Sequence, residues 1–171
     1  MVAALGAAGI RFLADGEDRS REAATMTPAA LITGLASHRD PRLHLALTAL
    51  FLLHPDWSAC VPDLVAALAG SARAELQARY MAAVYLQRFW KTRLGFYLGQ
   101  FPALPDFYSH ELGLPPADVR YGKPGLIELA EWHARHSAFP FNRLASYHKA
   151  ADLLFGQWHA EARQNEFAAA G

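Results

Sequence analysis

Apolar residues recur on two opposite sides of the stretch from Ser71 to Gly99 when it is placed on a helix. At about 100° per residue, one face gathers Leu76, Tyr80, Ala83, Leu86, Trp90, Leu94, Tyr97 and Leu98, and the opposite face gathers Ala78, Ala82, Tyr85, Phe89 and Phe96. Two polar seams separate the faces, one with Arg73, Gln77, Arg88 and Lys91 and the other with Glu75 and Arg93. A surface helix has one apolar stripe, so a helix with two must be covered on both sides. The pattern predicts a central helix over residues 71–99.

Local signals delimit this helix. Ser71 is a suitable N-cap, and Glu75 can pair with Arg79 at the i,i+4 spacing. Gly95 and Gly99 mark its end, and Pro102 and Pro105, which follow them, cannot continue the helix.

The same kinds of signal indicate further helices. Thr27 and Asp40 each precede a proline, the pattern of an N-cap with proline at the first helical position. The expected helices, besides 71–99, cover residues 28–38, 41–54, 58–69, 124–136 and 142–163, with a short helix near the start of the chain. No segment alternates apolar and polar residues for long, so we predict no sheet. The expected fold is all-α, a single-domain compact bundle of about six or seven helices around the 71–99 helix.

Three segments lie outside this pattern. Residues 1–20 are an N-terminal arm or short helix that ends in a charged stretch. Residues 100–123 are a long connection rich in proline and aromatic residues, and residues 164–171 are a tail that we expect to fray. The aromatic residues indicate that the connection is held against the body.

Composition narrows the classes of function. The chain has 171 residues, of which 53% are hydrophobic, enough for one substantial core. The 16 Lys and Arg residues balance the 16 Asp and Glu residues, so no global field draws the protein to nucleic acid or anionic membranes. Cys60 is the sole cysteine, which excludes an internal disulfide and fits a reducing compartment. No apolar run approaches the roughly 20 residues of a membrane span, so we expect a soluble, cytoplasmic protein.

The connection over residues 100–123 carries the first function hypothesis. Its aromatic residues include Phe107, Tyr108 and Tyr121, and aromatic residues at the centre of an exposed patch anchor protein interfaces. We therefore expect a non-catalytic interaction or regulatory module that binds a protein partner or forms a homo-oligomer through these three residues.

Histidines raise the question of a metal site. Glu131, His133 and His136 are close in sequence, and two histidines at i,i+3 on a helix can share a ligand sphere. However, the HExxH and paired ExxH patterns of helical metal sites are missing. The alternative is that His133 and His136 pair with carboxylates or stabilise the end of their helix. We expect no metal and no cofactor.

The segment Asn142-Arg143-Leu144-Ala145-Ser146-Tyr147-His148 holds an arginine, four residues and a histidine. This spacing resembles the R-x4-6-H motif of HEPN domains, helical bundles that include RNases and partners of nucleotidyltransferases. The resemblance implies that Arg143 would hold a scissile phosphate and that His148 would act on the ribose hydroxyl or the leaving group. Our alternative function is therefore an HEPN-like RNase, or the helical partner of a nucleotidyltransferase in a toxin–antitoxin-like pair. If the motif has no such role, Arg143 is a solvated cation and His148 lies on the flank of the helix.

Basic and aromatic residues are also interleaved along the central helix. Arg73, Arg88, Lys91 and Arg93 lie near Tyr85, Phe89, Trp90 and Tyr97, as a groove for single-stranded nucleic acid would need. The plainer interpretation places these rings in the core and the cations at its rim. Because a phosphate-binding loop and a GxSxG motif are also missing, we favour a non-enzyme.

Overall fold

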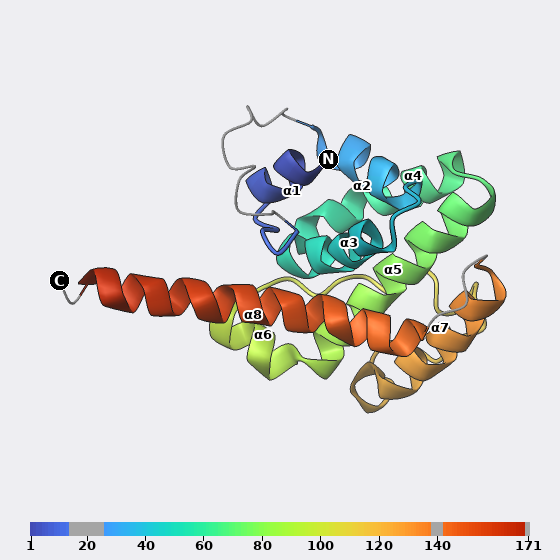
Figure 1. Ribbon diagram of the computed structural model, residues 1–171. Helices are drawn as coiled ribbons and strands as arrows, with labels where there is room; N and C mark the ends of the chain where they lie inside the picture. The colour runs from blue at the N-terminus through green and yellow to red at the C-terminus, as the bar shows by residue number, and fades with distance from the viewer. Residues whose placement is uncertain (14–25, 138–141, 170–171) are drawn as a thin grey trace.

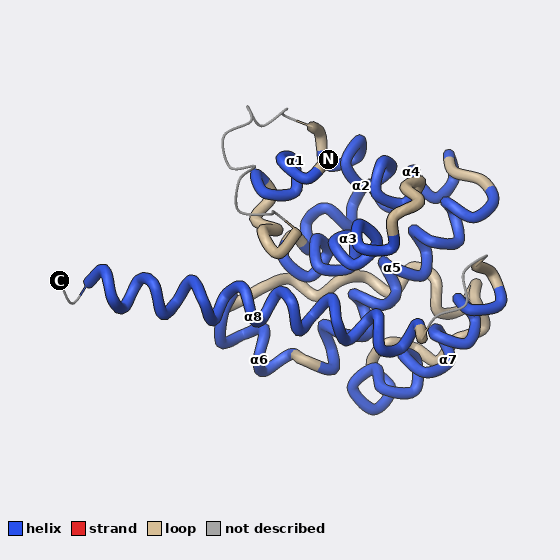
Figure 2. The backbone as a smooth tube through the Cα atoms, in the orientation of Figure 1, coloured by secondary structure: helices blue, strands red, loops and turns tan. Residues whose placement is uncertain are grey.

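The computed structural model describes residues 1–13, 26–137 and 142–169. Within them the chain forms α-helices and two short 3₁₀ helices, and no strand (Figures 1 and 2). In chain order these are α1 (Val2–Ala7), α2 (Pro28–Ala36), α3 (Pro41–Leu53), η1 (Pro55–Cys60), α4 (Val61–Ala67), α5 (Gly70–Phe89), α6 (Lys91–Leu98), η2 (Val119–Gly122), α7 (Lys123–Arg135) and α8 (Arg143–Ala169). The all-α fold class is confirmed.

Two of the three N-cap residues named from the sequence are confirmed. The Thr27 hydroxyl accepts a hydrogen bond from the Ala30 amide, and an Asp40 carboxylate oxygen accepts one from the Arg42 amide. The prediction for Ser71 is wrong, because α5 already begins at Gly70 with Ala69 as its N-cap residue and no side-chain cap. The charged stretch from Asp15 to Ser20 lies outside the described residues.

Helix α5 is the central element. It contacts α2, α3, α4, α6, α7 and α8, and every residue from Glu75 to Gln87 is buried. In Figure 1 it crosses behind α8. The central position follows from its two apolar faces, but burial extends further, to the residues that we placed in polar seams.

The helix expected over 71–99 is divided at Trp90, which gives α5 and α6. Trp90 has φ −103° and ψ 19°, outside the helical range. Beyond the break, the ring of Tyr97 lies 5.2 Å from that of Trp158 and 6.1 Å from that of Phe155 on α8. Because the chain changes direction at Trp90, Tyr97 packs against α8. A straight continuation of α5 would carry Tyr97 away from α8.

The connection after α6 covers part of the surface of α5 between the packed helices. The hydroxyl of Tyr80 donates to the carbonyl of Pro105, and that of Tyr85 donates to the carbonyl of Pro115, both at 2.7 Å. The side chain of Asp106 accepts from the amides of Ser109 and Ala117 and so closes the loop on itself. These bonds satisfy backbone groups in a segment without regular structure.

Helix α8 packs against α3, α5 and α7, and its C-terminal end extends past the other helices (Figure 1). It continues to Ala169, beyond Arg163 where we expected the helix to end. The side chain of Gln157 donates to the carbonyl of Gly9 and accepts from the amide of Arg11, which ties the N-terminal segment to α8.

In the described part of the chain, no single helix has both the length and the apolar composition needed to cross a membrane. One pair, Pro41–Leu53 with Pro55–Ala67, passes that test together but is bent by 110°.

Candidate functional site

A buried polar network surrounds Glu75 at the centre of the bundle. Its Oε1 accepts from Nε of Arg79 at 2.7 Å, the i,i+4 pair that the sequence predicted. The same oxygen lies 3.1 Å from Nδ1 of His44 on α3, and Oε2 lies 2.8 Å from Nε2 of His133 on α7. All four residues are buried. One carboxylate therefore joins α3, α5 and α7.

The two histidines make different contacts. Because a carboxylate only accepts, His133 donates to Glu75 from Nε2, and its Nδ1 accepts from the Tyr147 hydroxyl of α8 at 2.8 Å. His44 faces an acceptor at each nitrogen, since its Nε2 lies 2.8 Å from the carbonyl oxygen of His38 and its Nδ1 faces Glu75. A neutral His44 ring donates to one of these acceptors, and a protonated ring donates to both.

Burial and neighbouring charges set the ionisation of this network. Burial by itself raises the pKa of Glu75, but the hydrogen bond from His133 and the charge of Arg79 outweigh it and hold that pKa well below its usual range. Burial lowers the pKa of His44 and of His133, despite the nearby carboxylate. Burial also raises the pKa of Tyr147. At neutral pH the network holds an ionised Glu75, neutral histidines and a protonated Tyr147.

A pocket of about 360 Å³ opens onto Glu75 and His44, and its rim includes Ser37, Arg39, Ser71 and Ser137. Both Glu75 oxygens already face donors of the protein itself, so the carboxylate is not presented to a substrate. Within the described residues, no group of three or more His, Cys, Asp and Glu side chains could hold a metal ion. The geometry supports a structural role for the network, which fixes how the helices pack.

The histidines proposed for a metal site are separated by burial. His133 is buried in the network, whereas His136 is exposed and its ring stacks on Trp132 at 4.2 Å. Nδ1 of His136 donates to the carbonyl of Trp132 at 2.8 Å. Thus one histidine pairs with a carboxylate and the other lies at the end of its helix.

Arg143 and His148 have different surroundings. Arg143 is 3% exposed, and its guanidinium donates to the Ser137 hydroxyl. His148 is half-buried, with its ring edge-on to Phe89 at 5.5 Å. Five residues of helix place the two side chains about 140° apart around α8. Within one chain, the structure does not bring them into a shared cleft.

The three aromatic residues proposed for an interaction surface also differ. Tyr108 is 6% exposed, and its ring meets that of Tyr80 in the core. The ring of Phe107 stacks against that of Tyr80 and remains 39% exposed. Tyr121 is 76% exposed. Two of the three rings are therefore accessible to a partner.

Tyr121 stands in an unusual turn. Arg120 and Tyr121 both have positive φ, 45° and 57°, which few residues other than glycine adopt. Gly122 follows with φ 77°, and a Cβ there would lie 2.7 Å from the carbonyl oxygen of Tyr85. At Gly125 a Cβ would overlap the Tyr85 ring. The left-handed turn brings the start of α7 directly onto α5.

A second aromatic surface lies between α6 and α8, and we call it the α6/α8 patch. Its members are Phe89, Trp90, Phe96, Tyr97, Phe155 and Trp158, whose rings meet their neighbours at 4.9–6.1 Å. Phe155 is buried, Phe96 is 81% exposed, and the other rings are half-buried. Three of these residues belong to the basic and aromatic series noted in the sequence, whereas Tyr85 of that series is buried and hydrogen-bonded. Arg73 and Arg88 of the series pair with Glu111 and Asp118.

The sequence analysis expected the Glu75–Arg79 pair and allowed a carboxylate partner for His133, but it did not expect His44 and Tyr147 to join them in one network. The signal was present, because His44 stands among the apolar residues of the 41–54 helix and His133 stands on the apolar side of the 124–136 helix. A histidine on a core face needs a hydrogen-bond partner, and Glu75 and Tyr147 provide it.

Comparisons with models of protein families, with curated proteins and with solved structures find no match. Function must therefore be argued from the residues of this chain.

Proposed function

We propose that the protein is a non-catalytic interaction module that binds another protein, or a second copy of itself, through the turn at Val119–Gly122. The observation that carries this proposal is the exposed ring of Tyr121 on a backbone with positive φ. A left-handed conformation costs roughly 1–2 kcal/mol for a residue with a Cβ. Such strain persists where the surroundings hold it, and it clusters at functional positions.

The residue types at this turn favour a protein partner. Tyrosine and arginine are enriched among the residues that dominate binding energy at interfaces, and Arg120 and Tyr121 are adjacent and exposed. Val119 and Ile127 are exposed apolar residues of the same segment. Phe107 adds a second accessible ring from the preceding connection.

Site-specific photo-cross-linking tests this surface. A photoreactive phenylalanine analogue is placed at position 121, at position 107, or at the exposed control position Ala162 on α8. We expect one discrete cross-linked protein from positions 121 and 107 and none from 162. The same cross-links from all three positions would count against the proposal.

The captured protein is then purified and its affinity for the chain is measured. Tyr121→Ala should weaken binding by roughly tenfold or more, and Tyr121→Phe by much less. Sedimentation velocity of the isolated chain tests the second-copy form, since a dimer held by this turn dissociates in Tyr121→Ala. An affinity unchanged by Tyr121→Ala would contradict the proposal.

The HEPN-like alternative depends on Arg143 and His148, and it has a separate test. Single-stranded RNA is incubated with the purified chain and with His148→Ala. Cleavage that disappears in a folded His148→Ala variant would replace the interaction proposal with the nuclease one. Partnership with a nucleotidyltransferase is an outcome of the cross-linking experiment.

A further inference from the structure

The α6/α8 patch contains an arginine whose side chain is held by rings. The Cζ atom of Arg93 lies 4.1 Å from the ring centre of Phe155 and 5.6 Å from that of Trp90. Phe155 is buried although Arg93 is exposed, so the guanidinium covers the phenyl ring. A guanidinium stacked in this way has its orientation fixed, while the N–H groups at its edge remain free to bind.

The charged side chains of α6 itself have one sign. Helix α6 carries Lys91 and Arg93 in its first turn and no acidic residue. The helix dipole is positive at the N-terminus and therefore disfavours these cations. An anion bound there would be attracted both by the dipole and by the two basic side chains. In the part of the chain that the structure describes, Arg93 has no hydrogen bond or ion pair with a carboxylate. The guanidinium of Arg93 is therefore available to an anionic group from another molecule.

We propose that the α6/α8 patch binds an acidic segment of a protein, with a carboxylate of that segment paired in a bidentate manner with Arg93. The half-buried rings of Trp90, Tyr97 and Trp158 and the exposed ring of Phe96 receive apolar side chains next to that carboxylate. Trp, Tyr and Arg together are the residue types that dominate interface energies. This inference rests on the proposed interaction function and adds a second surface to it.

Charge complementarity selects an acidic protein over nucleic acid. A nucleic-acid surface needs cations that track several phosphates, whereas here Arg73 and Arg88 are paired with carboxylates and the formal net charge is +0. A single oriented guanidinium beside several rings fits one carboxylate and its apolar neighbours.

Labelled peptides of defined charge test the proposal by fluorescence anisotropy. The probe is a peptide that combines Asp with Leu and Phe, and its twins replace Asp by Asn or by Lys. We expect the Asp peptide to bind roughly tenfold or more tightly than the Asn twin, and the Lys twin not to bind. Arg93→Ala should remove this preference, and Arg93→Lys should restore only part of it because lysine lacks the planar fork.

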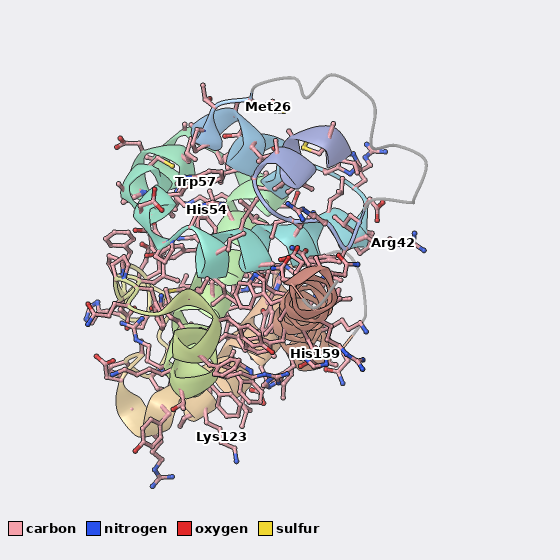
Figure 3. All side chains as sticks on the ribbon, turned by 90° about the vertical axis from the view of Figure 1, so that its left-hand side faces the viewer. Met26, Arg42, His54, Trp57, Lys123 and His159 are labelled. Atoms are coloured by element: carbon pink, nitrogen blue, oxygen red, sulfur yellow. The ribbon has the colours of Figure 1, made fainter. Side chains whose placement is uncertain are left out.

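Arg42→Ala is the matched control, because Arg42 is an exposed arginine on α3, away from α6 (Figure 3). It should bind the Asp peptide as the parent chain does, and so should Tyr121→Ala, which separates this surface from the turn. Three results would overturn the inference: no binding of the Asp peptide, equal binding of its twins, or an equal loss in Arg42→Ala. Tighter binding of a labelled oligothymidylate, lost in Arg93→Ala, would assign the patch to single-stranded nucleic acid instead.

Discussion

His133 of α7 donates from Nε2 to Oε2 of Glu75 of α5 at 2.8 Å, although the two residues are 58 positions apart. The other nitrogen of the same ring accepts from Tyr147 of α8. One imidazole thus satisfies polar groups from two helices at the centre of the bundle. A satisfied buried network specifies one packing, and it becomes costly when any partner is removed.

Replacing Glu75 by glutamine should destabilise the fold strongly. The change keeps the volume but leaves the fully buried guanidinium of Arg79 without its carboxylate. Breaking a buried ion pair from one side costs about 3–5 kcal/mol, a large part of a domain's stability. Urea denaturation followed by circular dichroism measures the free energy of unfolding.

Two further variants make this prediction specific. Glu111→Gln removes an exposed partner of Arg73, and such surface pairs contribute about 0–1 kcal/mol. The double variant Glu75→Gln with Arg79→Met removes the uncompensated charge and should recover part of the loss. A Glu75→Gln effect no larger than that of Glu111→Gln would show that the network contributes little.

Stability should fall as the pH is lowered. The folded-state pKa of His133 is below its unfolded value of about 6.5, and that of Glu75 is below about 4.5. Between the folded-state and unfolded-state pKa values of each group, the unfolded chain binds more protons than the folded chain, so stability rises with pH. We expect the loss to begin below about pH 6.5 and to steepen where the unfolded carboxylates titrate.

His133→Gln isolates the histidine part of this pH dependence. The amide can still contact Glu75 but does not titrate, so the slope of stability between pH 6.5 and pH 5 should become smaller than in the parent chain. Denaturant titrations at several pH values measure both slopes. A parent chain that gains stability on acidification through this range would contradict the assigned direction.

Local chemistry explains which parts of the fold were predictable. Thr27 and Asp40 act through bonds to amides two or three residues away, so their roles follow from neighbouring sequence. The division at Trp90 has no such signal, because it depends on the packing of Tyr97 against α8. Helix α6 is therefore a separate element that the expected count of six or seven helices did not include.

The site shows the same distinction. The pair of Glu75 and Arg79 follows from i,i+4 spacing, but its burial requires α3 and α7 to arrive with His44 and His133. Within the 100–123 connection, Phe107 and Tyr108 are adjacent and both contact Tyr80, yet Tyr108 is buried and Phe107 is 39% exposed. Tertiary contacts of this kind leave no periodic pattern in the sequence.

Gly125→Ala should destabilise the fold, because its Cβ would overlap the Tyr85 ring. That ring is buried and its hydroxyl is bonded to Pro115, so it has little room to move. Overpacking of this kind costs about 1–3 kcal/mol. Gly156→Ala on α8 is the control, since nothing lies within 4 Å of its Cβ and alanine in a helix gains about 0.5–1 kcal/mol over glycine. Opposite signs for the two variants in thermal unfolding confirm the close contact, and equal signs contradict it.

Glycine and alanine at position 121 should separate strain from binding. Tyr121→Gly relieves the positive φ of 57°, whereas Tyr121→Ala keeps a Cβ and therefore keeps the strain. Because the ring is largely exposed, its removal alone should change stability little. We expect the glycine variant to be more stable than the alanine variant by about 1 kcal/mol, measured by urea denaturation.

Both variants lack the ring, so both should lose the partner captured at position 121. If the strain at position 121 is maintained for function, Tyr121→Gly should be more stable than Tyr121→Ala and should still have lost binding. If Tyr121→Gly is instead less stable than Tyr121→Ala, the turn is unstrained and the argument from its backbone fails. If Tyr121→Gly retains binding, the turn contributes its backbone rather than its ring, and the partner contact must be sought at Arg120 or Phe107.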